Sequence, residues 1–228
     1  MHDMKNYMKI LSNSAFIQHI PRTIDEVIQI GNIQSYQNKE FIFQEGDIGK
    51  RIHLLLEGTV RIYRTYPSGQ QRTLMFIKPG EVFGNIPFLI DHERNISAEV
   101  FQPATDLSLD NEVIKEFIRE KPELLWYFID NLSTKLRNVS NMAIDDSYLS
   151  AERRIIRAIV LICDRFGKVT DQGIQIKLRF TQDDLARFSG TTRSTVAFVV
   201  LSLIDKGILS TKPKPWVVHN LDLLRELM

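Results

Sequence analysis

The stretch from 185 to 200, LARFSGTTRSTVAFVV, places several hydroxyl side chains and one guanidinium directly after a glycine. These residues are Thr191, Thr192, Arg193, Ser194 and Thr195. Hydroxyls can hydrogen-bond to phosphate oxygens, and a guanidinium can pair bidentately with a phosphate or with the O6 and N7 acceptors of guanine. The residue types in this segment therefore suit recognition of a nucleic acid.

Two short helices are predicted around this glycine. Thr181 is the expected N-cap of the first, and Asp184 takes the capping-box position that Glu or Gln usually occupies. Gly190 permits a sharp turn, and Thr192 caps a second helix that runs to about Lys206. The apolar residues of that second helix follow the i, i+3, i+4, i+7 pattern of a core-facing side: they are Val196, Val199, Val200, Leu203 and Ile204. This arrangement predicts a helix-turn-helix, whose second helix enters the DNA major groove with its N-terminus first.

The other side of the second helix is the predicted reading face. At about 100° per residue, Ser194, Phe198 and Leu201 point away from the core. Arg193 can pair with a guanine or a phosphate, and Phe198 can touch a thymine methyl group. A contact of Phe198 within its own domain is the alternative.

A strand, a turn and a second strand are predicted in ILSTKPKPWVVHN, after Gly207. The proline-stiffened turn presents Lys212 and Lys214 as a wing that contacts phosphate, although a merely solvated turn is the alternative. The complete set of residues predicted to bind DNA is Thr181, Gln182, Thr191, Thr192, Arg193, Ser194, Ala197, Phe198, Lys212 and Lys214.

A long helix opened by Pro122 precedes this region and carries a narrow apolar seam. Its members recur at alternating spacings of 4 and 3, which describes the a/d seam of a helix that pairs with a second copy: Leu125, Ile129, Leu132, Leu136, Val139 and Ala143. The alternative is packing on the chain's own β domain, and Trp126 and Phe128 are expected to form a second face toward that domain. The seam ends in AIDDSYLSAE, a predicted hinge, and Ser150 caps the next helix, which ends at Gly167.

Charge is distributed unevenly although the 228-residue chain has a net charge of only +1. From Asp146 onward there are 13 Lys and Arg against 9 Asp and Glu, whereas the part before it has 16 against 19. The C-terminal part is thus the one suited to a polyanion. The single Cys163 lies in an apolar run and cannot by itself form a disulfide, a zinc site or an iron–sulfur cluster. Neither a secretory signal nor a stretch of about 20 apolar residues is found, so a cytoplasmic protein without membrane contact is expected.

Short strands are predicted between about 36 and 109. Four glycines recur at nearly even intervals between segments rich in β-branched and aromatic residues, which is typical of an antiparallel sandwich or barrel with a glycine at each corner: Gly46, Gly58, Gly69 and Gly80. The preceding residues, to about 35, read as mainly helical or irregular.

Together these segments resemble the catabolite activator/FNR (CRP/FNR) family of bacterial transcription regulators. FTQDDLARFSGTTRSTVAFVVLSLIDKGIL is similar to its DNA-binding region, SAERRIIRAIVLI to the start of its C-terminal domain, and PGEVFGNIPFL with RNISAEV to its nucleotide-binding β-roll. The resemblance implies an α+β fold: an N-terminal antiparallel, jelly-roll-like β-roll that senses an effector (residues 1–118), a dimerisation helix and hinge (119–147) and a C-terminal winged helix-turn-helix (148–228). It also implies a homodimer on a palindromic operator, RNA polymerase as a partner of an activator, and effector residues Gly84, Asn85, Ile86, Arg94, Ser97 and Ala98.

The expected effector site departs from that of family members that bind cyclic AMP. A glutamate after the first glycine and an arginine before Ser-Ala hold the nucleotide in those proteins, whereas here Asn85 and Ile96 stand at these positions. Loss of the arginine removes the charged partner of a buried phosphate, and Arg94 lies two positions early. We therefore expect an effector other than cyclic AMP, or none, and the sequence does not choose. His53 and His92 are available as haem ligands but are expected to be surface or packing residues, so no cofactor is identified.

The reading face departs from the family as well. The usual Arg-Glu…Arg set appears here as Arg193, Ser194 and Phe198, so the family's usual half-site is not expected. Two other classes of function are weighed against a DNA-binding regulator. A cupin-type metalloenzyme would need clustered His and Glu ligands, which the β region lacks. A cyclic-nucleotide-binding-type regulatory module acting on a protein partner would leave the C-terminal domain without a role.

Overall fold

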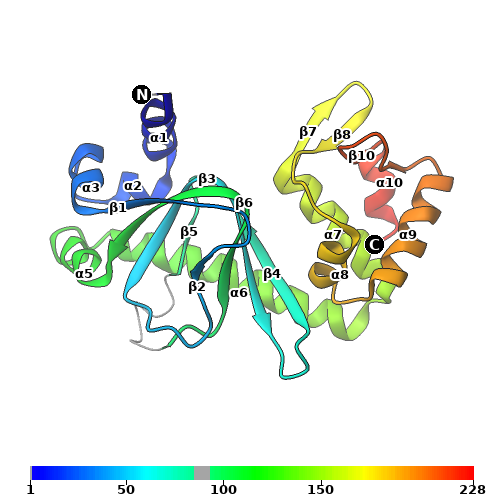
Figure 1. The fold of residues 1–228 in the computed structure, drawn as a ribbon, viewed down its shortest axis with the longest axis horizontal. Coiled ribbons are helices and arrows are strands. Elements are labelled where there is room, and N and C mark those ends of the chain that lie inside the picture. The colour runs from blue at the N-terminus through cyan, green and yellow to red at the C-terminus, as the bar shows by residue number, and fades with distance from the viewer. Residues whose placement is uncertain (1, 85–92) are drawn as a thin grey trace. The chain divides into compact units, whose positions relative to one another are not determined.

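A computed structural model describes residues 2–84 and 93–228 of the chain. The chain divides into two compact units, residues 1–137 and 138–228 (Figure 1). Each unit has its own sheet and its own hydrophobic core, and each is described separately below.

The first unit is built on an antiparallel sheet. Its strands are β1 (Asn32–Tyr36), β2 (Phe41–Phe43), β3 (Arg51–Thr65), β4 (Gln71–Ile77), β5 (Val82–Phe83) and β6 (Ser97–Asp110). They follow the order β1-β6-β3-β4, with β2 paired to β6 and β5 to β3. The predicted antiparallel β domain is confirmed. One strand boundary is wrong, however, because Gly58 lies inside β3 and not at a corner.

Glycine is required at position 58 because the backbones of β3 and β6 approach each other closely there. It has a φ of 84°, and the pairing of β3 with β6 shifts in register on both sides of it. A Cβ at this position would lie 2.1 Å from the carbonyl oxygen of Pro103 on β6. The chain therefore continues as one bulged strand, because a bulge bends and twists a strand without ending it.

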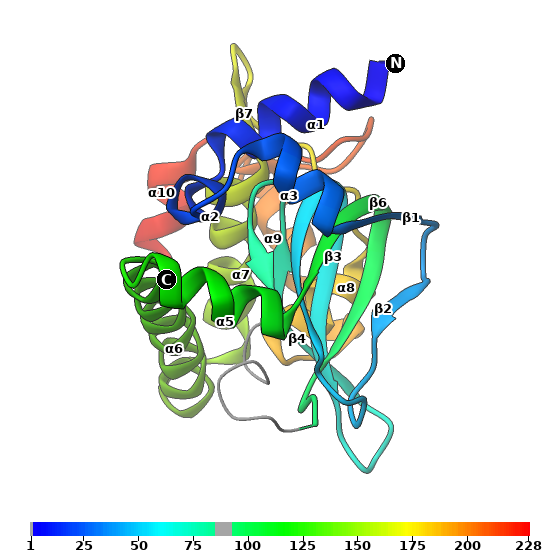
Figure 2. The same ribbon diagram turned by 90° about the vertical axis from the view of Figure 1, so that its left-hand side faces the viewer.

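Helices cover one face of this sheet, as Figures 1 and 2 show; among them are α1 (His2–Asn13), α2 (Ala15–His19), α3 (Ile24–Ile30) and α5 (Asn111–Glu120). Apolar side chains such as Leu11, Phe16 and Val27 of the first three helices pack against Leu54 and Leu107 of the strands. A second cluster, including Phe43, Leu55 and Phe83, fills the inside of the roll. The expected helical character of the N-terminal segment is confirmed, and its end contributes the edge strand β1.

A 25-residue helix, α6 (Leu124–Tyr148), follows α5. The predicted hinge is shorter than expected. Asp145, Asp146 and Ser147 are still helical, and only Leu149 and Ser150 separate α6 from α7 (Ala151–Phe166). The hydroxyl of Ser147 donates to the carbonyl of Ala143, which satisfies it within the helix. The predicted second face is wrong at Trp126, which is exposed, and right at Phe128, which is buried.

The second unit surrounds α7 with a small sheet and three helices. Its further elements are β7 (Gly167–Thr170), β8 (Gly173–Ile176), α8 (Gln182–Ser189), α9 (Arg193–Asp205), β9 (Leu209–Ser210), β10 (Val217–Val218) and α10 (Leu221–Glu226). The strands are ordered β7-β8-β10-β9. Ser150 caps α7 by accepting from the amide of Arg153, as predicted. Across the described ranges of both units, no helix has the length and apolar character needed to cross a membrane.

Candidate nucleic-acid interface and effector region

The first of the two helices around Gly190 is fixed by a reciprocal cap. The hydroxyl of Thr181 accepts from the amide of Asp184 at 3.2 Å, and the Asp184 carboxylate accepts from the amide of Thr181 at 2.9 Å. This confirms the predicted capping box with aspartate at its third position. The cap fixes the start of α8, at which Thr181 is exposed.

The turn between the helices uses a glycine in the left-handed region. Gly190 has a φ of 66° and is the C-cap of α8. The guanidinium of Arg154, from α7, donates to the carbonyls of Ser189 and Gly190 at 3.3 Å each. The hydroxyls of Ser189 and Thr191 lie 2.9 Å apart, so the hydroxyl of Thr191 is engaged within the turn.

Hydroxyl groups also organise the first turn of α9. Thr192 caps the helix by accepting from the amide of Thr195 at 3.2 Å. Its oxygen lies 2.8 Å from the hydroxyls of both Ser194 and Thr195. The exposed guanidinium of Arg193 lies 3.9 Å from a carboxylate oxygen of Asp183 on α8, so a loose ion pair presents it beside this cluster.

The two sides of α9 differ as predicted. Val196, Val199, Val200 and Leu203 are buried. Phe198, in contrast, is 73% exposed, and Leu201 is exposed one turn farther on. Ser194 is exposed and Ala197 is half-buried. The predicted outward direction of Ser194 and Phe198 is therefore confirmed, and the alternative that Phe198 is packed inside its domain is wrong.

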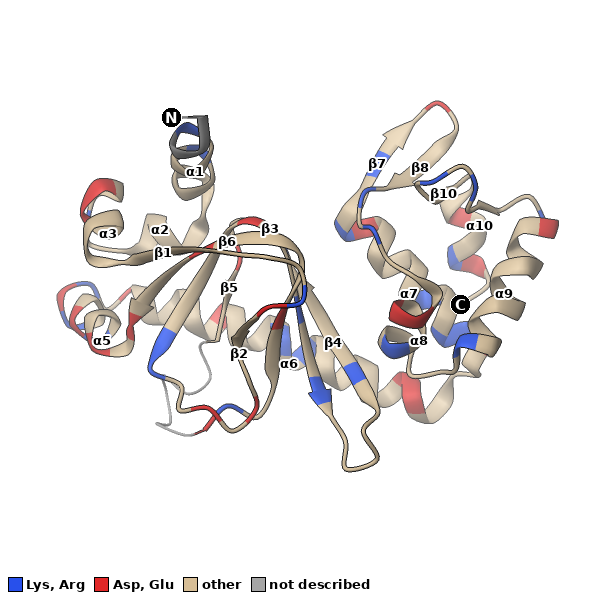
Figure 3. Ribbon diagram, viewed as in Figure 1, with Lys and Arg blue, Asp and Glu red and all other residues tan. Residues whose placement is uncertain are grey.

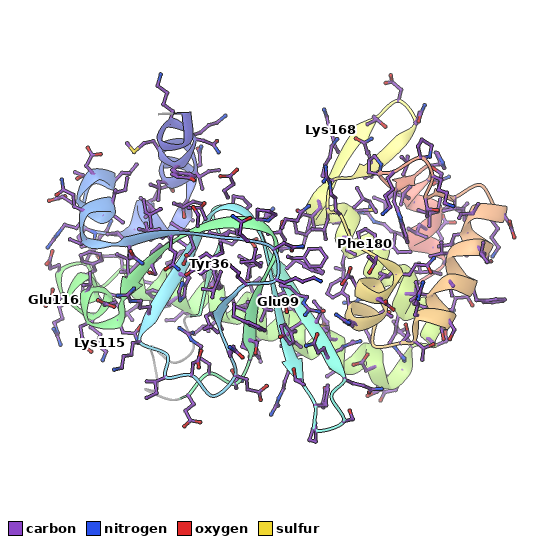
Figure 4. All side chains as sticks on the ribbon, viewed as in Figure 1. Tyr36, Glu99, Lys115, Glu116, Lys168 and Phe180 are labelled. Carbon is purple, nitrogen blue, oxygen red and sulfur yellow. The ribbon has the colours of Figure 1, made fainter. Side chains whose placement is uncertain are left out.

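The wing lies between β9 and β10 and carries Lys212 and Lys214, both exposed. Beside it a hollow of about 630 Å³ is bordered by Lys214 and by Lys177 and Arg179 of the segment joining β8 to α8. The rings of Phe180 and Trp216, 4.7 Å apart, also line it. Figure 3 shows the basic residues of the joining segment and the wing, and Figure 4 labels Phe180.

Sequence reasoning missed Lys177 and Arg179. The sequence pattern that could have indicated them is the alternation of basic and apolar residues in KLRF. In the structure Leu178 and Phe180 are buried and the two basic residues are exposed. An alternation of this kind places both basic side chains on the solvent side of an extended segment.

The predicted pairing seam of α6 is open to solvent along most of its length. Leu136 is 68% exposed, and the side chains of Leu125, Ile129, Val139 and Ala143 are also exposed, with Leu132 half-buried. A row of exposed apolar residues on one helix is costly in water unless another surface covers it.

The predicted effector residues are only partly brought together. Asn85 and Ile86 lie outside the described residues. The guanidinium of Arg94 donates to the carbonyl of Gly84 at 3.0 Å and to that of Arg51 at 2.8 Å. Ser97 and Ala98 begin β6, where the Ser97 hydroxyl accepts from the amide of Glu45 and Ala98 is buried. Arg94 is thus held by backbone carbonyls.

A second cation near Gly84 was not predicted. The ammonium of Lys135, on α6, donates to the carbonyl of Val82 at 3.2 Å, two residues before Gly84. Burial lowers the pKa of Lys135 to about 8, against a smaller opposing effect of Glu81. The signal was helical spacing, because Lys135 lies 7 and 11 residues after the buried Phe128 and Leu124 and therefore on their face of the helix.

Histidine and cysteine have structural places in this fold. His53 is buried, its Nδ1 is 2.5 Å from a carboxylate oxygen of Asp106, and its ring stacks on Phe83. It is a packing residue, as predicted, while His92 lies outside the described residues. Cys163 is buried, and burial raises its thiol pKa to about 12, so it is unreactive. Within the described part of the chain, no group of three His, Cys, Asp or Glu side chains could hold a metal ion.

Comparison with known proteins gives matches over both units. Residues 33–121 match the family model of the cyclic nucleotide-binding domain, and residues 153–227 match that of the Crp-like helix-turn-helix domain. A "Cyclic AMP receptor protein" of Thermus thermophilus is 29% identical over 208 residues, covering 91% of this chain and 93% of the relative. A "Global nitrogen regulator" of Nostoc sp. is 27% identical, covering 82% and 85%. The structure of FixK2 from Bradyrhizobium japonicum has the same fold, with a TM-score of 0.77 at 19% identity over 87% of this chain and 97% of that one.

Proposed function

This chain belongs to the CRP/FNR family of transcription regulators, and from that premise we propose that it binds a palindromic DNA site as a homodimer. It is a regulator with a cyclic-nucleotide-binding-type domain and a DNA-binding helix-turn-helix, and it is not an enzyme. We assign effector sensing to residues 1–118, pairing to 119–147 and DNA binding to 148–228. RNA polymerase is a further partner if the protein activates transcription.

One observation carries the proposal: the side of α9 that faces away from its core. It combines the exposed Arg193, the hydroxyl of Ser194 and the exposed ring of Phe198 on consecutive helical turns. Arg193 is placed to read a guanine, and Phe198 to touch a thymine methyl group, while Thr181, Gln182 and the wing lysines hold phosphates. Asp183 must release Arg193 when the helix enters the groove, and their separation of 3.9 Å makes that release cheap.

Pairing of two chains follows from the seam of α6. Its exposed apolar residues recur at the a/d spacing of a two-stranded helical interface, as with Leu125, Ile129 and Leu136. Two-fold pairing presents two recognition helices, which enter successive major grooves when they lie about 34 Å apart. This explains why the operator should be palindromic.

The proposed effector is an anion other than cyclic AMP, bound near Gly84, Ser97 and Ala98. The relatives are named for cyclic AMP and for nitrogen regulation, so their names do not agree on one effector. In this chain Ile96, at the position of the phosphate-binding arginine, packs against the apolar cluster inside the roll. Cyclic AMP would there lose the arginine that pairs with its phosphate, so micromolar binding of it in calorimetry would contradict this assignment. The cation that we propose for a different anion is the half-buried Lys135, whose ammonium donates to the carbonyl of Val82, two residues before Gly84.

The test is selection of bound fragments from genomic DNA, followed by sedimentation of the protein with and without the selected site. We expect an enriched palindrome and a two-chain species. Leu136→Asp should yield single chains that retain folded α-helix content and lose the site, because a carboxylate interrupts the seam. Thr134→Asp, an exposed position on the opposite side of α6, is the matched control and should behave as wild type. A wild-type protein that sediments as one chain and enriches no sequence would refute the proposal.

A further inference from the structure

The helix α9 is apolar on all its sides over most of its length. From Val196 to Ile204 the only polar side chain is that of Ser202. One side of the helix is buried in the core of the second unit, but the other carries Phe198 and Leu201, which are 73% and 60% exposed. A helix that is apolar all round is normally covered on every side. The outward side of α9 therefore needs a partner surface.

Charged side chains stand only at the two ends of α9, all of whose residues are described (Figure 3). Arg193 begins the helix and the exposed Asp205 ends it. Between them the outward side runs from the hydroxyl of Ser194 to Phe198 and Leu201. Phosphates attract the cation and repel the carboxylate. The first turn of α9 is thus suited to DNA, the apolar pair follows it directly, and Asp205 marks where contact with DNA ends.

The apolar pair is continuous with the DNA-binding side of the helix-turn-helix. Phe198 follows Ser194 by four residues and Leu201 follows it by seven, so that all three share one side of α9. This helix is the second of the two in the segment that matches the Crp-like helix-turn-helix domain. The second helix of this motif lies in the major groove. DNA, and not another protein, is therefore the surface that we assign to the pair.

The chemistry of the pair limits what it can recognise. Neither side chain has a hydrogen-bond donor or acceptor, and the apolar group that the major groove offers is the C5-methyl of thymine. Residues three apart on a helix have their Cβ atoms about 5–6 Å apart. Successive nucleotides of one strand are about 3.4 Å apart along the DNA axis. Phe198 and Leu201 can therefore contact methyl groups on two neighbouring base pairs.

We propose that Phe198 and Leu201 together read the 5-methyl groups of two neighbouring pyrimidines in each half-site. The inference rests on the DNA binding proposed above and adds Leu201 to the reading face. Thymine and 5-methylcytosine carry the same methyl group at C5, so both satisfy the pair. Uracil and unmethylated cytosine lack this group and leave an apolar side chain without its contact.

Base analogues in the selected DNA site test the chemistry. Deoxyuridine lacks only the methyl group of thymidine and keeps its hydrogen-bonding atoms. We expect two neighbouring thymines in each half-site at which this replacement weakens binding by about fourfold per methyl group, as for one buried methylene. Where a C·G pair is placed at either position, 5-methylcytosine should bind more tightly than cytosine by a similar factor. Fluorescence anisotropy at constant salt measures each affinity.

Two outcomes separate this inference from the proposed function. If deoxyuridine replaced every thymine of the selected site without loss of affinity, the reading of methyl groups would be wrong while DNA binding stood. The outward side of α9 would then be covered by a protein. If the wild-type protein selected no DNA site, the proposed function would be refuted and this inference with it.

Matched variants locate the contact on the protein. Phe198→Ala should remove the response to deoxyuridine at one of the two thymines, and Leu201→Ala should remove it at the neighbour. Leu223→Ala changes an exposed leucine of α10 and should keep both responses. The readout is the ratio of affinities for thymidine and deoxyuridine DNA, taken at lower salt where overall affinity falls, because a general loss of binding leaves this ratio unchanged. If both variants kept the wild-type ratios, other residues would contact the methyl groups and the inference would be wrong.

Discussion

Two arginines show how differently the two units use the same side chain. Arg193 begins α9 with a side chain that is 71% exposed and a distant carboxylate as its neighbour. Arg94 is 5% exposed, and its guanidinium is held by two carbonyls and an aromatic ring. The first arginine is available to a partner and contributes little to the fold. The second binds three separate chain segments together and must contribute to stability.

The largest effect is expected from removing the exposed arginine. Arg193→Ala should abolish sequence-specific binding at moderate salt, because a bidentate guanine contact is worth about 1–3 kcal/mol and the dimer loses two. The free energy of unfolding should change by less than about 0.5 kcal/mol, as is usual for an exposed side chain. Fluorescence anisotropy with specific and scrambled duplexes measures the first quantity, and urea unfolding measures the second. Lys206→Ala, beyond the far end of the same helix, is the control. Unchanged specific affinity would show that the reading face is misplaced.

The buried arginine should show the opposite pattern. Arg94→Met keeps an unbranched side chain but leaves the carbonyls of Gly84 and Arg51 without their donor, so we expect a loss of about 3 kcal/mol in unfolding free energy. Arg51→Met removes only the exposed ion pair with Asp110 and should cost less than about 1 kcal/mol. Urea unfolding of both variants gives the comparison. Equal losses would mean that the burial of Arg94 has no energetic consequence.

A second cation of the first unit, the half-buried Lys135, should make the free energy of unfolding depend on pH. Its pKa falls from 10.5 to about 8 on folding because burial disfavours the charged form. Between these values the unfolded chain binds more protons, so this lysine makes stability rise with pH. The full contribution is about 3 kcal/mol, at about 1.4 kcal/mol for each unit of pKa.

Tyrosines and Cys163 with raised pKa act in the opposite direction in this range. The measured quantity is therefore the difference in unfolding free energy between wild type and Lys135→Met. Between pH 8 and pH 9.5 the free energy of unfolding of wild type should rise by at least 1 kcal/mol relative to that of the variant. A constant difference would contradict the lowered pKa.

The surroundings of Arg193 could be predicted from the sequence, whereas those of Arg94 could not. The caps at Thr181 and Thr192, the turn at Gly190 and the outward side of α9 depend on residues within a few positions of one another, and these predictions are confirmed. The place of Arg94 depends on contacts with residues 10 and 43 positions away, which no local pattern contains. The roles in DNA, effector and partner binding stay predictions in both regions.

Two misplaced boundaries have the same origin. Gly58 was expected at a corner because glycine favours turns, but the approach of Pro103 on a distant strand explains it. Asp145 and Asp146 were expected to end the long helix. They are instead held in it by α7, with the Asp145 carboxylate 2.7 Å from the Arg157 guanidinium and that of Asp146 3.6 Å from Arg154. Tertiary ion pairs overrode a weak helix propensity.

The smallest effects are expected from the basic residues around the wing. Arg179→Ala and Lys212→Ala should each weaken binding to specific and scrambled DNA by the same factor, because phosphate contacts carry no sequence information. Each should also reduce the salt slope of log K by about 1 per contact removed. Titrations at several salt concentrations measure both quantities, and Lys9→Ala in the first unit is the control. If Arg179→Ala lowered only specific affinity, this side chain would read bases. The hollow bordered by Lys177, Arg179 and Lys214 would then contact bases together with the outward side of α9. Its residues could no longer be assigned to phosphate contacts alone.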